Sequence, residues 1–187
     1  MKNYYILAIN PGSTSMKMAI YRDEERIAKS QVNYSAEELR PFETVVDQLP
    51  LRYKSVRDFI EQQGPELHLS AVVGRGGVIV PVESGAYQVN ELMVDRLRNR
   101  PLGQHASNLG GILAYQVAAQ LGIPAYVYDG VTVNEFEPLA YLTGFRDVIR
   151  LSRCHALNMR AMAIRAAKEA GSSYSEMNQI VVHMGGG

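Results

Sequence analysis

The sequence predicts an α/β protein with a sheet of mixed strand direction. Residues 4–10 form an apolar run that ends in a turn of small residues, and residues 17–21 read as a second strand with no helix between the two, so this pair should be antiparallel. Further along, β-branched runs alternate with segments whose apolar residues recur at helical spacing, which is typical of α/β sheets. Residues 179–183 form a last β-branched run, which three glycines follow.

Capping and stop signals place the helices. Asn90 and Ser107 are typical N-cap residues, Gly122 and Gly171 follow helical runs as C-terminal stops, and Pro41 breaks a run that a capping box opens. Helices are therefore expected at 35–40, 49–60, 90–98, 107–121 and 157–170, with a short one after the capping box at 173–176, and further strands are expected at 67–73 and 125–128.

Composition excludes several classes of function. The 187 residues carry 19 Lys and Arg against 19 Asp and Glu, so net charge gives no reason to expect nucleic acid or an anionic membrane as partner. The single cysteine, Cys154, excludes an intramolecular disulfide and reads as a small buried hydrophobe. Because there is neither a signal-peptide pattern nor an apolar stretch of ~18 residues, we expect a cytoplasmic protein.

The first turn is suited to phosphate. Asn10, Ser13 and Ser15 surround Gly12 where an apolar strand ends, so backbone N–H groups and short hydroxyls should point above the sheet edge. Gly12 and Lys17 do not form a P-loop, because that pattern requires a glycine directly before the lysine and a hydroxyl residue directly after it. An ordinary serine-rich hairpin is the alternative.

Three polar residues follow other predicted strands or precede helices. Arg75 lies among glycines, and its guanidinium has the shape to hold a carboxylate with two parallel bonds. His105 lies just before a helix N-terminus, and Asp129 stands at the carboxyl end of a strand, the usual ligand side of an α/β sheet. A surface arginine, an exposed histidine and an Asp-Gly turn are the ordinary alternatives.

Two further histidines flank the last predicted helix and strand. His155 precedes the helix, where an imidazolium could neutralise charge on a transferring phosphoryl group, although capping or packing is an equal alternative. His183 ends the last β-branched run before Gly185, Gly186 and Gly187, which could let the backbone approach a phosphate.

These motifs together resemble the butyrate kinases, within the acetokinase family of carboxylate kinases. The matching segments are 6–17, 72–77, 101–111, 128–129 and 183–187. The resemblance implies a mixed-sheet ribonuclease H-like domain of the acetate and sugar kinase, heat-shock and actin superfamily, followed by the start of a second similar domain. It also implies reversible transfer of the γ-phosphoryl group of ATP to butanoate, giving butanoyl phosphate and ADP, with Mg2+ required, in a homo-oligomer that is a dimer or larger.

The resemblance also implies roles for the candidate residues. Arg75 would hold the substrate carboxylate, with His105 near it or near the γ-phosphoryl group, while His155 would stabilise the transferring group. Asp129 would orient Arg75 or hold Mg2+ through water. The residues implied to contact phosphate, or water on the metal, are Asn10, Ser13, Ser15, Lys17, His183, Gly185, Gly186 and Gly187. Arg75 departs from the wider family, whose arginine precedes a Val-Val-His-Gly-Gly run, because here the arginine lies inside Gly-Arg-Gly-Gly.

Length is the largest departure from the family, whose members are close to twice as long. We therefore expect a first domain over 1–148, the beginning of a second over 149–187, and an incomplete active site in this chain alone. A kinase for acetate, propionate or a branched-chain acid and a non-catalytic fragment of such a kinase are the alternatives, and the sequence assigns no metal ligands.

Overall fold

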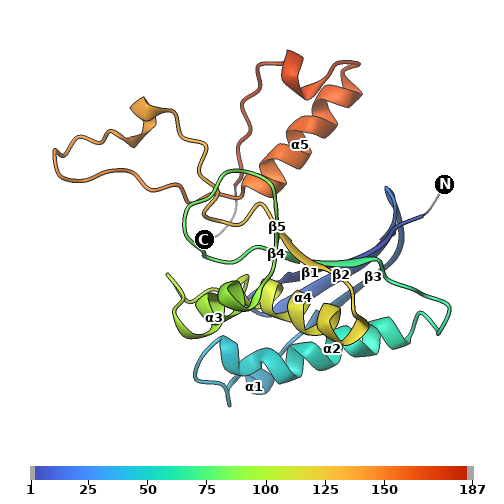
Figure 1. Cartoon of the computed structure of the whole chain (residues 1–187). Coiled ribbons are helices and arrows are strands. Elements are labelled where there is room, and N and C mark those ends of the chain that lie inside the picture. The colour runs from blue at the N-terminus through green and yellow to red at the C-terminus, as the bar shows by residue number, and fades with distance from the viewer. Residues whose placement is uncertain (1–2, 185–187) are drawn as a thin grey trace.

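The computed structural model describes residues 3–184, and a six-stranded sheet forms its centre (Figure 1). The strands lie in the order β3-β2-β1-β4-β6-β5. Their bounds are β1 Tyr5–Pro11, β2 Ser15–Arg22, β3 Glu25–Asn33, β4 Ala71–Arg75, β5 Ala86–Gln88 and β6 Ala125–Tyr128.

The sheet has both strand directions, as predicted. β1, β4 and β6 run parallel to one another, whereas β1–β2, β2–β3 and β5–β6 are antiparallel pairs. Since β1 and β2 pair in register with Asn10 opposite Lys17, these two side chains lie on the same face of the sheet.

Helices cover one face of this sheet. Figure 1 shows α2, α3 and α4 on one side and α5 on the other. Alternate residues of β1 and β2, such as Leu7, Ile9 and Met18, are buried against the first group, in one core with Val56 of α2 and Ile112 of α4. The α-helices are α1 Ala36–Leu39, α2 Leu49–Glu61, α3 Glu91–Asn99, α4 Asn108–Leu121 and α5 Ala156–Glu169, with 3-10 turns at Val46–Gln48, Pro138–Tyr141 and Tyr174–Glu176.

Helix α4 lies against β4 with almost no space between the two backbones. A Cβ atom placed on Gly74 would lie 2.1 Å from the carbonyl oxygen of Gly110, and one on Gly110 would lie 2.3 Å from the carbonyl oxygen of Arg75. Only glycine permits this approach, which fixes the end of β4 where Arg75 emerges.

Several predicted caps are present. Asn90 accepts a hydrogen bond from the backbone of Met93, Ser35 and Glu38 form a capping box, and Gly122 ends α4 in the left-handed conformation. Ser107 stands at the N-cap of α4, but its hydroxyl makes no capping bond and contacts His105 instead.

The strand predictions were wrong in four places. β3 and β5 were not predicted, because β3 alternates small and polar residues and β5 has only three residues. The strand expected at 67–73 lies at Ala71–Arg75. Within the described part of the chain, residues 179–183 form no strand and Ile180 is 95% exposed, since no neighbouring strand is there to take its backbone hydrogen bonds.

No helix of residues 3–184 combines the length and the apolar character that crossing a bilayer would require.

Candidate functional site

A cavity of about 810 Å³ opens on the face of the sheet that α2 and α4 leave uncovered. Its wall includes alternate residues of β1 and β2, the ends of β4 and β6, and the start of α5. Six of the residues that the sequence singled out lie on this wall: Asn10, Lys17, Arg75, Asp129, His155 and His183. The fold thus brings together side chains that are more than a hundred residues apart in the chain.

Arg75 is a half-buried cation without a countercharge. It is the last residue of β4, and no carboxylate among residues 3–184 forms an ion pair with it. Burial lowers the pKa of its guanidinium, which stays protonated at neutral pH. A partly desolvated guanidinium at a cavity wall is a ready partner for an anionic ligand.

His155 and His183, which both line the cavity, stack on each other. Their ring centroids are 4.2 Å apart and the ring planes differ by 21°. Burial lowers the pKa of His155, and the nearby His183, Arg75 and His105 lower it further, which favours a neutral imidazole. The imidazolium role expected for His155 therefore requires an anion between these groups.

His105 lies outside the cavity wall, although it is near enough to Arg75 for the two to interact electrostatically. Its Nδ1 accepts the backbone N–H of Ser107 at 3.1 Å and lies 2.7 Å from the Ser107 hydroxyl. Burial, and then the charge of Arg75, lower its pKa. With Nδ1 acting as acceptor, the neutral ring carries its proton on Nε2 and can donate from that atom.

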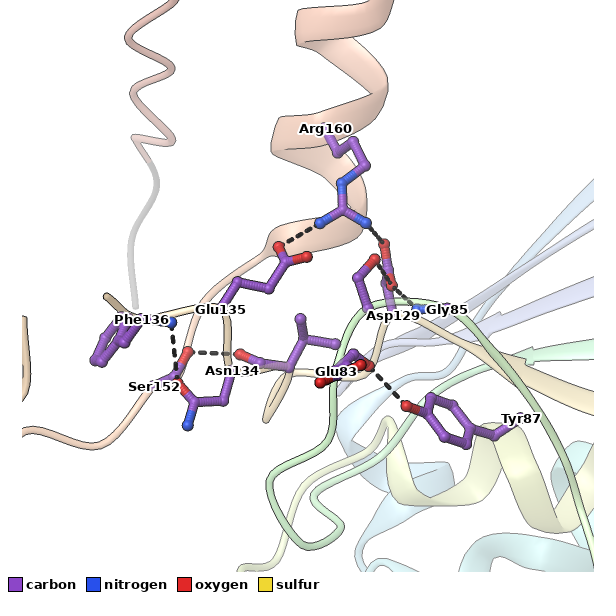
Figure 2. Close-up of polar contacts among 11 residues, drawn as sticks. Glu83, Gly85, Tyr87, Asp129, Asn134, Glu135, Phe136, Ser152 and Arg160 are labelled. Carbon is purple, nitrogen blue, oxygen red and sulfur yellow. Dashed lines mark hydrogen bonds and ion pairs between the residues drawn. The ribbon is translucent and has the colours of Figure 1, made fainter. Parts of the chain in front are cut away.

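Asp129 has a different partner from the one expected. Its buried carboxylate accepts from the Ser84 hydroxyl at 2.8 Å and the Gly85 N–H at 2.9 Å through Oδ1, and from Arg160 at 3.0 Å through Oδ2. Figure 2 shows Arg160 between Asp129 and Glu135, with which it also pairs. Asp129 therefore orients Arg160 on α5, and the structure gives no ion pair between Asp129 and Arg75.

The described residues do not form a Mg2+ site by themselves. No group of three or more His, Cys, Asp or Glu side chains within residues 3–184 is arranged to hold a metal ion. Oδ1 of Asp129 accepts two hydrogen bonds and Oδ2 accepts one, from Arg160.

The turn between β1 and β2 lies at the end of the hairpin, beyond the cavity wall. Ser13 and Ser15 do not line the cavity, whereas Asn10 and Lys17 of the same hairpin do. The Gly12 N–H donates to the Ser15 carbonyl at 2.7 Å, and the Tyr34 N–H donates to the Thr14 carbonyl at 2.8 Å. Gly185, Gly186 and Gly187 lie outside the described residues.

The sequence did not single out two arginines near these groups. Arg52 of α2 is fully buried beneath the β1–β2 turn, and Arg160 of α5 joins Asp129 to Glu135. In the sequence each reads as an exposed residue of an amphipathic helix, and no local signal separates them from arginines such as Arg57 that lie at the surface.

No family model matches the sequence. Curated proteins are similar to it over nearly its whole length. Butyrate kinase 1 of Clostridium acetobutylicum is 46% identical over 185 residues, which are 98% of this chain and 52% of that protein. Probable butyrate kinase 2 of Caldanaerobacter subterraneus is 44% identical over 98% of this chain and 52% of its own length. The chain thus spans about half the length of the curated relatives it matches.

Solved structures of carboxylate kinases share the fold. Acetate kinase of Porphyromonas gingivalis superposes with a TM-score of 0.56 at 16% identity, covering 91% of this chain and 50% of that one. Propionate kinase of Francisella tularensis gives 0.58 at 14% identity, with 90% and 50% covered. These matches confirm the predicted mixed-sheet α/β fold, which this chain shares with acetate and propionate kinases. In sequence, the chain is homologous to butyrate kinases at 41–46% identity, as the N-terminal half of such a protein would be.

Proposed function

We propose that the protein carrying this chain is a carboxylate kinase that transfers the γ-phosphoryl group of ATP to butanoate, reversibly. The observation that carries the proposal is Arg75, a half-buried guanidinium without a carboxylate partner among the described residues, on a cavity wall shared with Lys17 and the His155–His183 pair. The names of the homologues support butyrate kinase over other carboxylate kinases.

The chemistry asks little of a general base. A short-chain carboxylate, with a pKa near that of Glu at ~4.3, is already ionised at neutral pH and is itself the nucleophile. Catalysis then rests on positioning and on neutralising negative charge. ATP would supply the phosphoryl group, and Mg2+ would be the counterion of its phosphates.

Each described group has a task in this proposal. Arg75 would hold the acid with two parallel N–H bonds and fix it in the cavity. Lys17 would lie against phosphate from β2, with Asn10 beside it on β1, and His105 would donate from Nε2 near Arg75. His155 and His183 would donate hydrogen bonds to the transferring group, and the approach of its negative charge would raise the pKa of His155.

The larger organisation is part of the same proposal. We place the carboxylate kinase domain at 1–148 and the beginning of a second domain at 149–187. A cytoplasmic homo-oligomer, a dimer or larger, fits a metabolic kinase of this kind. Acetate, propionate and branched short-chain acids remain the alternative substrates, since the structural relatives include acetate and propionate kinases.

A hydroxamate assay for acyl phosphate tests the function. The protein encoded by the whole reading frame that contains these residues is incubated with MgATP and acetate, propionate, butanoate or isobutanoate. Butanoate should give the highest kcat/KM, and Arg75→Ala should lower kcat/KM for butanoate by at least about tenfold, or ~1.4 kcal/mol.

Matched controls separate binding from folding. Arg57→Ala removes an exposed arginine of α2 and should leave turnover unchanged. Turnover of no acid by the folded protein would contradict kinase activity altogether, whereas a preference for acetate would keep the reaction and replace the substrate.

A further inference from the structure

A buried cation without a countercharge lies beneath the β1–β2 turn. Arg52 has no solvent exposure and forms no ion pair with any carboxylate among residues 3–184. Its partners are neutral: Gln48 Oε1, at 3.0 Å from Nε and 2.8 Å from Nη2, and the aromatic ring of Tyr34, 4.8 Å from Cζ. Removing an unpaired charge from water costs several kcal/mol, so the position requires a reason.

The remaining bonds of Arg52 go to the turn. Nη1 donates to the carbonyl oxygen of Ser15 at 3.1 Å, and Nη2 donates to that of Ser13 at 3.0 Å. The Tyr34 N–H binds the carbonyl of Thr14 between them. Three successive carbonyls of the turn are therefore held, two by the Arg52 side chain and one by the backbone of Tyr34, which directly follows β3.

Peptide geometry converts these bonds into a direction for the N–H groups. In a trans peptide the C=O and N–H of one unit point in opposite directions, and no described peptide bond is cis. Because Arg52 holds the Ser13 carbonyl inward, the Thr14 N–H points outward. No described residue accepts a hydrogen bond from the N–H of Ser13 or Thr14, and both residues are exposed.

We propose that Arg52 is a positioning residue for phosphate: it orients and polarises the Thr14 N–H outward and places a buried positive charge one peptide layer below the bound anion. The inference rests on the proposed function, in which this hairpin faces the phosphates of the nucleotide. A cation bonded to a carbonyl strengthens the donor at the other end of the same peptide unit. An anion on the turn would also supply the countercharge that Arg52 lacks.

Inorganic phosphate and MgATP, titrated separately into the 15N-labelled protein encoded by the whole reading frame, provide the test. Wild type should show phosphate-induced shifts at the Ser13 and Thr14 amides. Arg52→Met keeps apolar bulk and removes the charge; it should lose these shifts or weaken phosphate binding by at least about tenfold. The Gly12 amide and Arg52 both donate to the carbonyl oxygen of Ser15. In Arg52→Met, hydrogen exchange of the Gly12 amide should therefore become at least about tenfold faster than in wild type.

The matched control is Arg57→Met, which removes an exposed arginine about 1.4 turns further along the same helix. Arg57→Met should leave both phosphate binding and Gly12 exchange unchanged. The exchange rate of the Met93 amide should stay the same in every variant, because that amide donates to the Asn90 cap, which is not part of the turn. If Arg52→Met does not fold, Arg52→Lys replaces it: one ammonium keeps the charge but cannot span both carbonyls and Gln48, so phosphate binding should weaken although the variant still folds.

The outcomes are distinguishable. Wild-type phosphate affinity and wild-type Gly12 exchange in the folded Arg52 variant would overturn the role of Arg52 while leaving the proposed kinase intact. Absence of phosphate shifts at Ser13 and Thr14 in wild type, with Arg75-dependent turnover still present, would overturn this phosphate site and Arg52's part in it. Loss of both turnover and phosphate shifts in the folded wild type would overturn the proposed function itself.

Discussion

At the scale of single residues, positive charge gathers around the cavity with few carboxylates to balance it. Arg75 has no acidic partner among residues 3–184, and its charge lowers the pKa values of both His105 and His155. The pKa values of the two histidines therefore depend on the charge of Arg75, so measuring them tests the position of Arg75 without an activity assay.

Arg75→Gln should raise the pKa of His105 toward its ordinary value, because a nearby positive charge is removed while burial remains. The His155 pKa should rise as well, since Arg75 also contributes to its shift. An NMR titration of the imidazole protons measures both. Unchanged titration of His105 in the folded variant would contradict the placement of Arg75 beside it.

The same pKa shifts predict how the free energy of unfolding changes with pH. The pKa values of His105 and His155 are lower in the folded chain than in the unfolded one, so below about pH 6.5 the unfolded chain binds more protons. The stabilisation from the neutral rings is present above that value and is lost as the pH falls through it toward the folded-state pKa values. Urea denaturation of Arg75→Gln should show a smaller loss of stability between about pH 7.5 and 5.5 than wild type.

Asp129 offers a second test at a single residue. Asp129→Ala should destabilise the fold by about 3 kcal/mol, because it leaves the Gly85 N–H, the Ser84 hydroxyl and Arg160 without their buried acceptor. Glu135→Ala removes the other, more exposed partner of Arg160 and should cost less than about 1 kcal/mol. Equal losses in urea denaturation would show that the Asp129 contacts are not formed.

At the scale of elements, the predictable parts are those with a local signal. α2 and α4 follow from their apolar spacing and their glycine stops, and α3 from the Asn90 cap. β3 was not predicted because a strand at the sheet edge, half-buried on one face, carries no continuous apolar run. Arg52 was not predicted because its burial depends on a turn nearly forty residues earlier in the chain, and a helical pattern alone gives no sign of that contact.

The contact between α4 and β4 gives a prediction at this scale. Gly110→Ala forces a methyl group against the carbonyl oxygen of Arg75, so it should cost about 2 kcal/mol or more and displace the residue at the end of β4. Gly144→Ala, where a Cβ meets no other atom, should change stability by less than about 0.5 kcal/mol. Thermal denaturation measures both, and similar melting temperatures for the two variants would contradict the close packing.

At the scale of the whole molecule, apolar side chains are exposed on one projecting segment. Figure 1 shows the chain between β6 and α5 extending away from the sheet. Leu139, Phe145 and Leu151 of this segment are 77%, 76% and 63% exposed. On α5, Met162 and Ile164 are about half exposed, whereas Leu157 and Met159 are partly buried.

Such exposure should make the 187-residue chain self-associate in a concentration-dependent manner. Phe145→Ser combined with Leu139→Ser should reduce association in sedimentation velocity without altering the melting temperature, because neither side chain is buried in this chain. A wild-type chain that stays monomeric at about 100 μM would contradict the prediction, since weak association is measurable at that concentration.

The contact between Gly74 and Gly110 also limits how the sequence can change over evolutionary time. In most packed pairs a larger residue on one side is tolerated when a smaller one appears on the other, so the two positions drift together. Here the obstructing atoms are main-chain carbonyls, which every amino acid carries. No substitution elsewhere can make room, and each glycine should be retained independently of the other, with no compensating partner in any sequence that keeps α4 on β4.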